Sequence, residues 1–131
     1  MREILFRGKD TDTGEWVEGY YEFGYDSETE TPTHYMWVLN HTEKYGEMFM
    51  VIPETVGQYT GLEDRNGKKI FEGDIVMLIL ASSQHKGEVV FHNGGFCVNG
   101  LDLYVSLQET PAYEFKHLGN IHDNPELLSK K

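Results

Sequence analysis

The feature that most constrains the fold is a succession of short strand-like segments, separated by turn residues at intervals of roughly ten positions. Apolar and polar residues alternate within these segments, as in residues 101–108, and no stretch has the 3.6-residue periodicity of an amphipathic helix. Asn66 and Gly67 are the residues that a tight hairpin turn requires. The pattern predicts a mainly β protein with a small antiparallel barrel-type fold and short helical turns at 53–56 and 123–128. An α+β fold with a β-barrel subdomain is the alternative.

The length of the chain suits one compact domain that folds as one cooperative unit. Residues 24–34 are polar and acidic and include Pro32, which predicts a mobile loop.

The charge balance argues against one class of partner. The chain has 22 acidic residues against 11 Lys and Arg residues, a net charge of −11. Nine acidic and three basic residues fall within residues 1–31, so more than half of the net charge lies near the N-terminus. Because DNA-binding surfaces displace counterions with Lys and Arg, we expect no general affinity for nucleic acid.

The cysteine and hydropathy patterns suggest a compartment. Cys97 is the only cysteine, so no intramolecular disulfide can form and a disulfide-stapled secreted domain is excluded. The longest apolar stretch, residues 75–81, is far shorter than the ~20 residues of a membrane-spanning helix. The N-terminus lacks the apolar run of a signal peptide. We therefore expect a cytoplasmic protein with no membrane association.

One acidic segment resembles the start of a calcium-binding loop. Asp10, Asp12 and Gly14 alternate as carboxylate ligands and a turn residue would. The glycine falls at the fifth position instead of the sixth, and Tyr21 occupies the position of the bidentate glutamate. The segment therefore predicts a hairpin turn.

Metal-ligating and catalytic patterns are otherwise sparse. His117, His122, Asp123 and Cys97 could form a zinc site only if the fold gathered them, and no Cys-x-x-Cys or His-x-x-x-His spacing supports one. We expect His117 to be a structural histidine. The sequence has no nucleophile elbow, Walker loop or dinucleotide-binding glycine motif. We predict no catalytic residues, no cofactor, no metal and no enzymatic activity.

Aromatic and basic residues supply the candidate interaction surface. The aromatic residues concentrate in the strand expected over 15–23 and just after it, and the basic residues flank the Asn-Gly turn. Part of the aromatic group is expected to enter the core and part to face an interface. The candidate residues are Trp16, Tyr20, Tyr25, Arg65, Lys68 and Lys69.

Long motifs indicate a family. They read VIPETVGQYTGL at 51–62, DRNGKKIFEGDIV at 64–76 and GNIHDNPELL at 119–128, with REILFRGK at the N-terminus. These motifs resemble those of the YopX family of phage and prophage proteins, whose biochemical function is unknown. The resemblance implies a β-rich N-terminal lobe over residues 1–56 and an SH3-like β-barrel lobe over residues 57–131, in the C-terminal half. It also implies that the protein acts in a bacterial host cell. It implies no catalytic residue.

Two hypotheses for function follow. The first is a phage or prophage accessory protein that acts as a non-enzymatic protein-binding or assembly module, with a protein partner or through self-association. The alternative is a nucleic-acid-associated or DNA-mimicking protein that acts on host DNA-binding machinery. An enzyme would instead need a pocket in which histidine and carboxylate groups with shifted pKa values converge.

Overall fold

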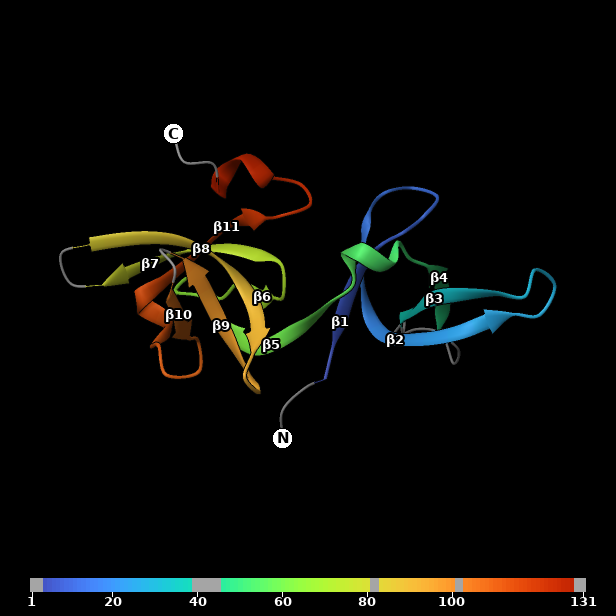
Figure 1. Ribbon diagram of the computed structural model, residues 1–131, viewed down its shortest axis with the longest axis horizontal. Coiled ribbons are helices and arrows are strands. Elements are labelled where there is room, and N and C mark those ends of the chain that lie inside the picture. The colour runs from blue at the N-terminus through green and yellow to red at the C-terminus, as the bar shows by residue number, and fades with distance from the viewer. Residues whose placement is uncertain (1–3, 39–45, 81–82, 101–102, 129–131) are drawn as a thin grey trace. The chain divides into compact units, whose positions relative to one another are not determined.

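The computed structural model describes residues 4–38, 46–80, 83–100 and 103–128 (Figure 1). Within these ranges the chain forms eleven β-strands and three single-turn 3-10 helices, so the prediction of a mainly β protein is confirmed. The strands belong to two antiparallel sheets. The chain separates into two compact units, Met1–Gln58 and Tyr59–Lys131.

The first unit is a meander of antiparallel strands. In chain order its elements are β1 (Phe6–Lys9), β2 (Trp16–Asp26), β3 (Thr31–Val38), β4 (Glu47–Met50) and the 3-10 helix η1 (Pro53–Thr55). The strands pair in the order β4-β3-β2-β1. A bridge between Asp10 and Val51 ties the end of β1 to the residue after β4. Met36 and Val51 are buried in this unit.

Residues 24–34 form a hairpin, so the prediction of a mobile loop was wrong. Phe23 pairs with His34 and Tyr25 pairs with Pro32 across β2 and β3. The Asp26 carboxylate closes the turn by accepting hydrogen bonds from the backbone N–H groups of residues 28 and 29, at 2.8 and 3.2 Å. Aromatic side chains alternate with the polar ones, and this alternation favours a strand even where the mean hydropathy is low.

The second unit contains a five-stranded sheet. Its elements, in chain order, are β5 (Gly57–Glu63), β6 (Lys69–Phe71), β7 (Asp74–Leu80), β8 (Ser83–His92), β9 (Gly95–Gly100), β10 (Leu103–Ser106), η2 (Ala112–Glu114), β11 (Phe115–Asn120) and η3 (Pro125–Leu128). The sheet has the order β10-β9-β8-β7-β11. Its core consists of Ile70, Val76, Leu78, Val89, Val98, Leu107 and Phe115.

The predicted barrel is not closed by hydrogen bonds. Among the described strands, the ladders of the five-stranded sheet end at β10 on one side and β11 on the other. The first two residues of β5 pair with β1, and the rest of β5 forms a short hairpin with β6. The register of that hairpin shifts between Tyr59 and Glu63, a stretch that contains Gly61 with a φ of 86°. The short, irregular ladder therefore does not complete the ring of strand pairings that closure requires.

Candidate functional site

The aromatic residues singled out in the sequence lie on both faces of β2. Tyr20 and Tyr25 are five positions apart, so the alternation of a strand places their side chains on opposite faces. Trp16 is half-buried: the Arg7 guanidinium lies 4.5 Å from the centre of its ring and the Lys9 ammonium 5.4 Å. Trp16 therefore contributes to packing through cation–π contacts.

Tyr20 belongs to an apolar sheet face that we call the Trp37 face. Cross-strand pairing aligns Tyr20, Trp37 and Met48 in one row across β2, β3 and β4. The next row on the same face contains Glu22, Tyr35 and Met50. Tyr20 is 52% exposed, and Met48 and Met50 are 49% and 50% exposed. Five aromatic or methionine side chains therefore cover this face; β3 and β4 supply four of them.

The opposite face of the β2–β3 hairpin carries a second aromatic group. Phe23 packs against His34 with ring centres 5.0 Å apart and against Tyr25 edge-on at 6.3 Å. The Tyr21 hydroxyl hydrogen-bonds to Nδ1 of His34. Burial raises the pKa of the Tyr21 hydroxyl. Phe23 and Tyr25 remain 55% and 70% exposed.

The three basic candidates gather at the turn between β5 and β6, in the second unit. Arg65 and Lys68 have exposed side chains, and Lys69 is half-buried with its ammonium 5.5 Å from the centre of the Tyr59 ring. The buried carboxylate of Asp64 organises the turn by accepting hydrogen bonds at 2.9 Å from the backbone N–H groups of Asn66 and Lys68. The sequence analysis did not single out Asp64.

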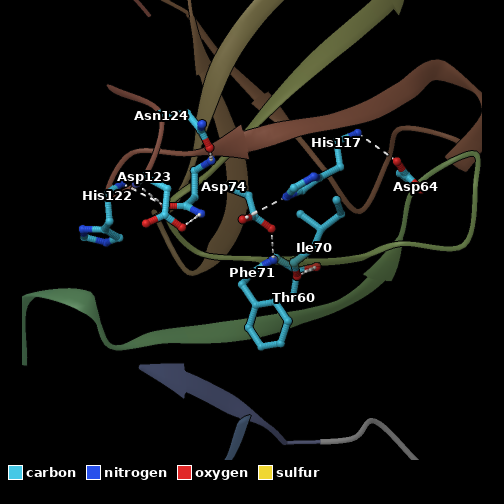
Figure 2. Close-up of polar contacts among 10 residues, drawn as sticks. Thr60, Asp64, Ile70, Phe71, Asp74, His117, His122, Asp123 and Asn124 are labelled. Carbon is cyan, nitrogen blue, oxygen red and sulfur yellow. Dashed lines mark hydrogen bonds and ion pairs between the residues drawn. The ribbon is translucent and has the colours of Figure 1, made fainter. Parts of the chain in front are cut away.

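A polar network in the second unit connects residues of the sequence motifs (Figure 2). Asp74 is fully buried, and its Oδ2 accepts a hydrogen bond from the Phe71 backbone N–H at 2.8 Å. Its Oδ1 lies 3.3 Å from Nε2 of His117. The backbone N–H of His117 donates in turn to Oδ2 of Asp64 at 2.8 Å. Three segments, those of β6–β7, β11 and the Asp64 turn, are therefore joined by two carboxylates and one histidine.

The C-terminal motif forms its own part of this network. Asn120 Oδ1 accepts hydrogen bonds from the backbone N–H groups of His122 and Asp123, at 2.9 and 2.8 Å, and its amide donates to the Asp123 carboxylate at 3.1 Å. Gly119 lies against Asn124 so closely that a Cβ there would collide with the carboxamide. The chain turn after β11 is therefore stabilised by side chains within the motif.

The geometry around Asp64 and His117 suits a role in stability better than one in proton transfer. Burial acts to raise the pKa of Asp64, but the backbone N–H groups of His117, Lys68 and Asn66 outweigh it and hold the pKa below its ordinary value. A carboxylate that accepts three backbone hydrogen bonds and has a lowered pKa is a weak base. His117, Asp64 and Lys68 are among the residues that line a depression of about 520 Å³. Nε2 of His117 faces Asp74.

In the part of the chain that the structure describes, no three His, Cys, Asp or Glu side chains lie close enough to hold a metal ion. The Asp10 carboxylate accepts a hydrogen bond from the Asp12 backbone N–H within a hairpin turn. No described helix has the length and apolar character needed to span a bilayer.

A second depression lies at the β8–β9 turn. It has a volume of about 450 Å³ and is lined by His92, Cys97, Tyr104, Ser106 and Gln108, among others. The His92 and Tyr104 rings stack with their centres 3.8 Å apart. No carboxylate is among the described residues that line this depression. They therefore offer no histidine–carboxylate pair for general acid–base chemistry.

Comparison with known proteins identifies the family. The family model described as YopX protein matches residues 5–129. This chain belongs to the YopX family. The resemblance drawn from the sequence motifs is therefore confirmed, and the motif residues Asp74, Gly119 and Asn120 are among those that build the buried polar network.

Two solved structures of YopX-like fold are similar to the chain. One is the crystal structure of protein EF1440 from Enterococcus faecalis, with 24% identity, a TM-score of 0.60, and coverage of 98% of this chain and 100% of that one. The other is the X-ray crystal structure of protein yopX from Bacillus subtilis, with 20% identity, a TM-score of 0.52, and the same coverage of 98% and 100%. At these identities the likeness shows the fold alone. No curated protein matches the chain in sequence.

The lowered pKa of Asp64 predicts a pH-dependent contribution to stability. Because the folded pKa lies below the unfolded value of about 3.9, the contribution is present above that value and is lost as the pH falls through the folded pKa. Asp64→Asn is expected to cost about 1–3 kcal/mol near neutral pH and less below about pH 4. Urea unfolding of both proteins at several pH values measures the difference, and a pH-independent difference would contradict the assignment.

Proposed function

We propose that this YopX protein is a phage or prophage accessory protein that acts in the bacterial cytoplasm as a non-enzymatic protein-binding module. The observation that carries the proposal is the Trp37 face, on which two cross-strand rows place Tyr20, Tyr35, Trp37, Met48 and Met50. Aromatic and methionine side chains are enriched in protein interfaces and depleted from free surfaces. Their contiguity on three strands supports a binding role for this face.

The occupant that fits this face is a different protein. Residues 1–58 hold twelve acidic and four basic residues, a net charge of −8. Two copies that met through this unit would bring like charges together, which disfavours self-association. A partner with positive charge around an apolar patch would be attracted to it.

Photo-crosslinking tests the proposal. A benzoylphenylalanine residue replacing Met48 is expected to yield a discrete adduct with another protein in cells that carry the gene. The same residue replacing Tyr104, which at 50% exposure matches the 49% of Met48, serves as the control in the second unit and is expected to yield none. Tyr20→Thr with Met50→Thr is expected to reduce the Met48 adduct at least fivefold, because threonine keeps the strand propensity and removes the apolar surface.

Sedimentation analysis of the purified protein tests the proposal independently. The protein is expected to be a monomer at all concentrations. A dimer that Tyr20→Thr dissociates would assign the face to self-association and overturn the proposal, as would identical adducts from positions 48 and 104.

A further inference from the structure

The β2–β3 hairpin extends beyond the strands on either side of it. The ladder between β1 and β2 ends at Gly19, and the ladder between β3 and β4 begins at Tyr35. Residues 22–34 are called the hairpin arm. Residues 23–34 pair only with each other, and at the base Glu22 pairs with Tyr35 and the Val51 N–H donates a hydrogen bond to the His34 carbonyl. Figure 1 shows the arm running past β4. A two-stranded ribbon of this kind is marginally stable in water by itself.

The two faces of the arm differ in chemistry. Phe23 and Tyr25 project from one face of β2 and are both more than half exposed. Glu22 and Asp26 occupy alternate positions and therefore project from the other face. The arm thus presents an apolar side and an acidic side along a single strand.

The charge of the arm has one sign. Residues 22–34 contain four acidic residues, Glu22, Asp26, Glu28 and Glu30, and no Lys or Arg. The whole stretch 10–43 holds nine acidic residues and neither Lys nor Arg. The arm would repel a second copy of itself and the phosphates of nucleic acid, and it would attract a basic chain.

One edge of the arm is open to a further strand. Among the described residues, no strand lies beside residues 22–26 of β2 on the side away from β3. The backbone groups on such an edge can pair with an added extended segment, whose alternate side chains then fall on the two faces of the ribbon. Apolar side chains would meet Phe23 and Tyr25, and basic side chains would meet Glu22 and Asp26.

We infer that the hairpin arm binds an extended segment of a partner protein in which apolar and basic residues alternate. The inference rests on the proposed function and names the partner's chemistry. Main-chain pairing supplies affinity, and the apolar–acidic division of the arm selects the alternating pattern.

Defined peptides test the pattern. The probe is a fluorescein-labelled peptide of about ten residues in which Lys and Val alternate. Its matched control has the same composition with the five lysines grouped before the five valines. In anisotropy titrations the alternating peptide is expected to bind the full-length protein at least tenfold more tightly, and raising the salt from about 50 to about 500 mM is expected to weaken it. Equal binding of the two peptides would overturn the inference.

Matched variants locate the binding on the arm. The double variant Phe23→Thr, Tyr25→Thr is expected to bind the alternating peptide at least tenfold more weakly. Tyr104→Thr is expected to leave the affinity for the peptide unchanged. Glu22→Gln, Glu28→Gln and Glu30→Gln together are expected to weaken it at least threefold. Glu63→Gln, Glu109→Gln and Glu126→Gln remove the same charge from exposed positions of the second unit and are expected to change it less than twofold. Equal losses from the two triple variants would overturn the inference.

Failure of this inference is distinguishable from failure of the proposed function. A Met48 adduct that persists at full yield in the Phe23→Thr, Tyr25→Thr protein would support protein binding at the Trp37 face and overturn the role of the arm. Loss of the adduct in that variant, together with loss of peptide binding, would support both.

Discussion

Replacing Asp74 with alanine is expected to lower the free energy of unfolding by about 3–5 kcal/mol. The side chain is fully buried, and it accepts a hydrogen bond from the Phe71 N–H while its other oxygen faces His117. Removing it deletes the carboxylate that accepts from the Phe71 N–H and faces His117 at a buried position, and the loss of a buried hydrogen-bond acceptor costs more than the bond alone. Urea unfolding of the full-length protein, followed by far-UV circular dichroism, measures the loss.

Two further variants separate the buried interaction from a general effect of removing an acid. Asp74→Asn retains an oxygen for the Phe71 N–H but loses the charge that faces His117, so a smaller loss of about 1–3 kcal/mol is expected. Asp12→Ala removes an exposed aspartate and is expected to change stability by less than about 0.5 kcal/mol. A loss below about 1 kcal/mol for Asp74→Ala would show that the network contributes little.

Replacing Gly19 with alanine is expected to destabilise the protein by about 3 kcal/mol. A Cβ on Gly19 would overlap the carbonyl oxygen of Trp37 on the neighbouring strand. Backbone cannot move aside as a side chain can, so β2 and β3 would have to separate where the Tyr20–Trp37 row begins. Thermal and urea unfolding would measure the loss, and the Met48 adduct would report whether the Trp37 face is displaced.

Gly24 provides the matched control on the same strand. A Cβ at Gly24 would meet only the Tyr35 ring, at 3.8 Å, which is an ordinary van der Waals contact. Gly24→Ala is therefore expected to be neutral or to stabilise the protein by up to about 1 kcal/mol, since alanine restricts the unfolded chain. Equal losses at positions 19 and 24 would contradict the close approach of the two strands.

Local patterns in the sequence predicted most of the elements because turns and strand alternation are local. The Asn66-Gly67 turn and the helical turn at Pro53 follow from residues that prefer those backbone angles. Residues 24–34 were mispredicted because their acidic residues lower the mean hydropathy. The alternation of Phe23 and Tyr25 with Glu22 and Asp26 was the available signal of a strand.

The candidate site was predicted in part. Tyr20 and Tyr25 were singled out as exposed aromatics, and both are more than half exposed. Trp37, Met48 and Met50 were missed because the register between β3 and β4 decides which side chains share a face.

The sequence by itself determined the mainly β fold, the turns, the family and the concentration of acidic charge toward the N-terminus, since each depends on composition or on residues close together in the chain. Only the tertiary structure decided which aromatic side chains form the Trp37 face, that the predicted barrel stays open, and that Asp64, Asp74 and His117 meet. These residues are far apart in sequence, and their meeting depends on strand register and on burial, which convert separate polar groups into one network by excluding the water that would otherwise satisfy each of them.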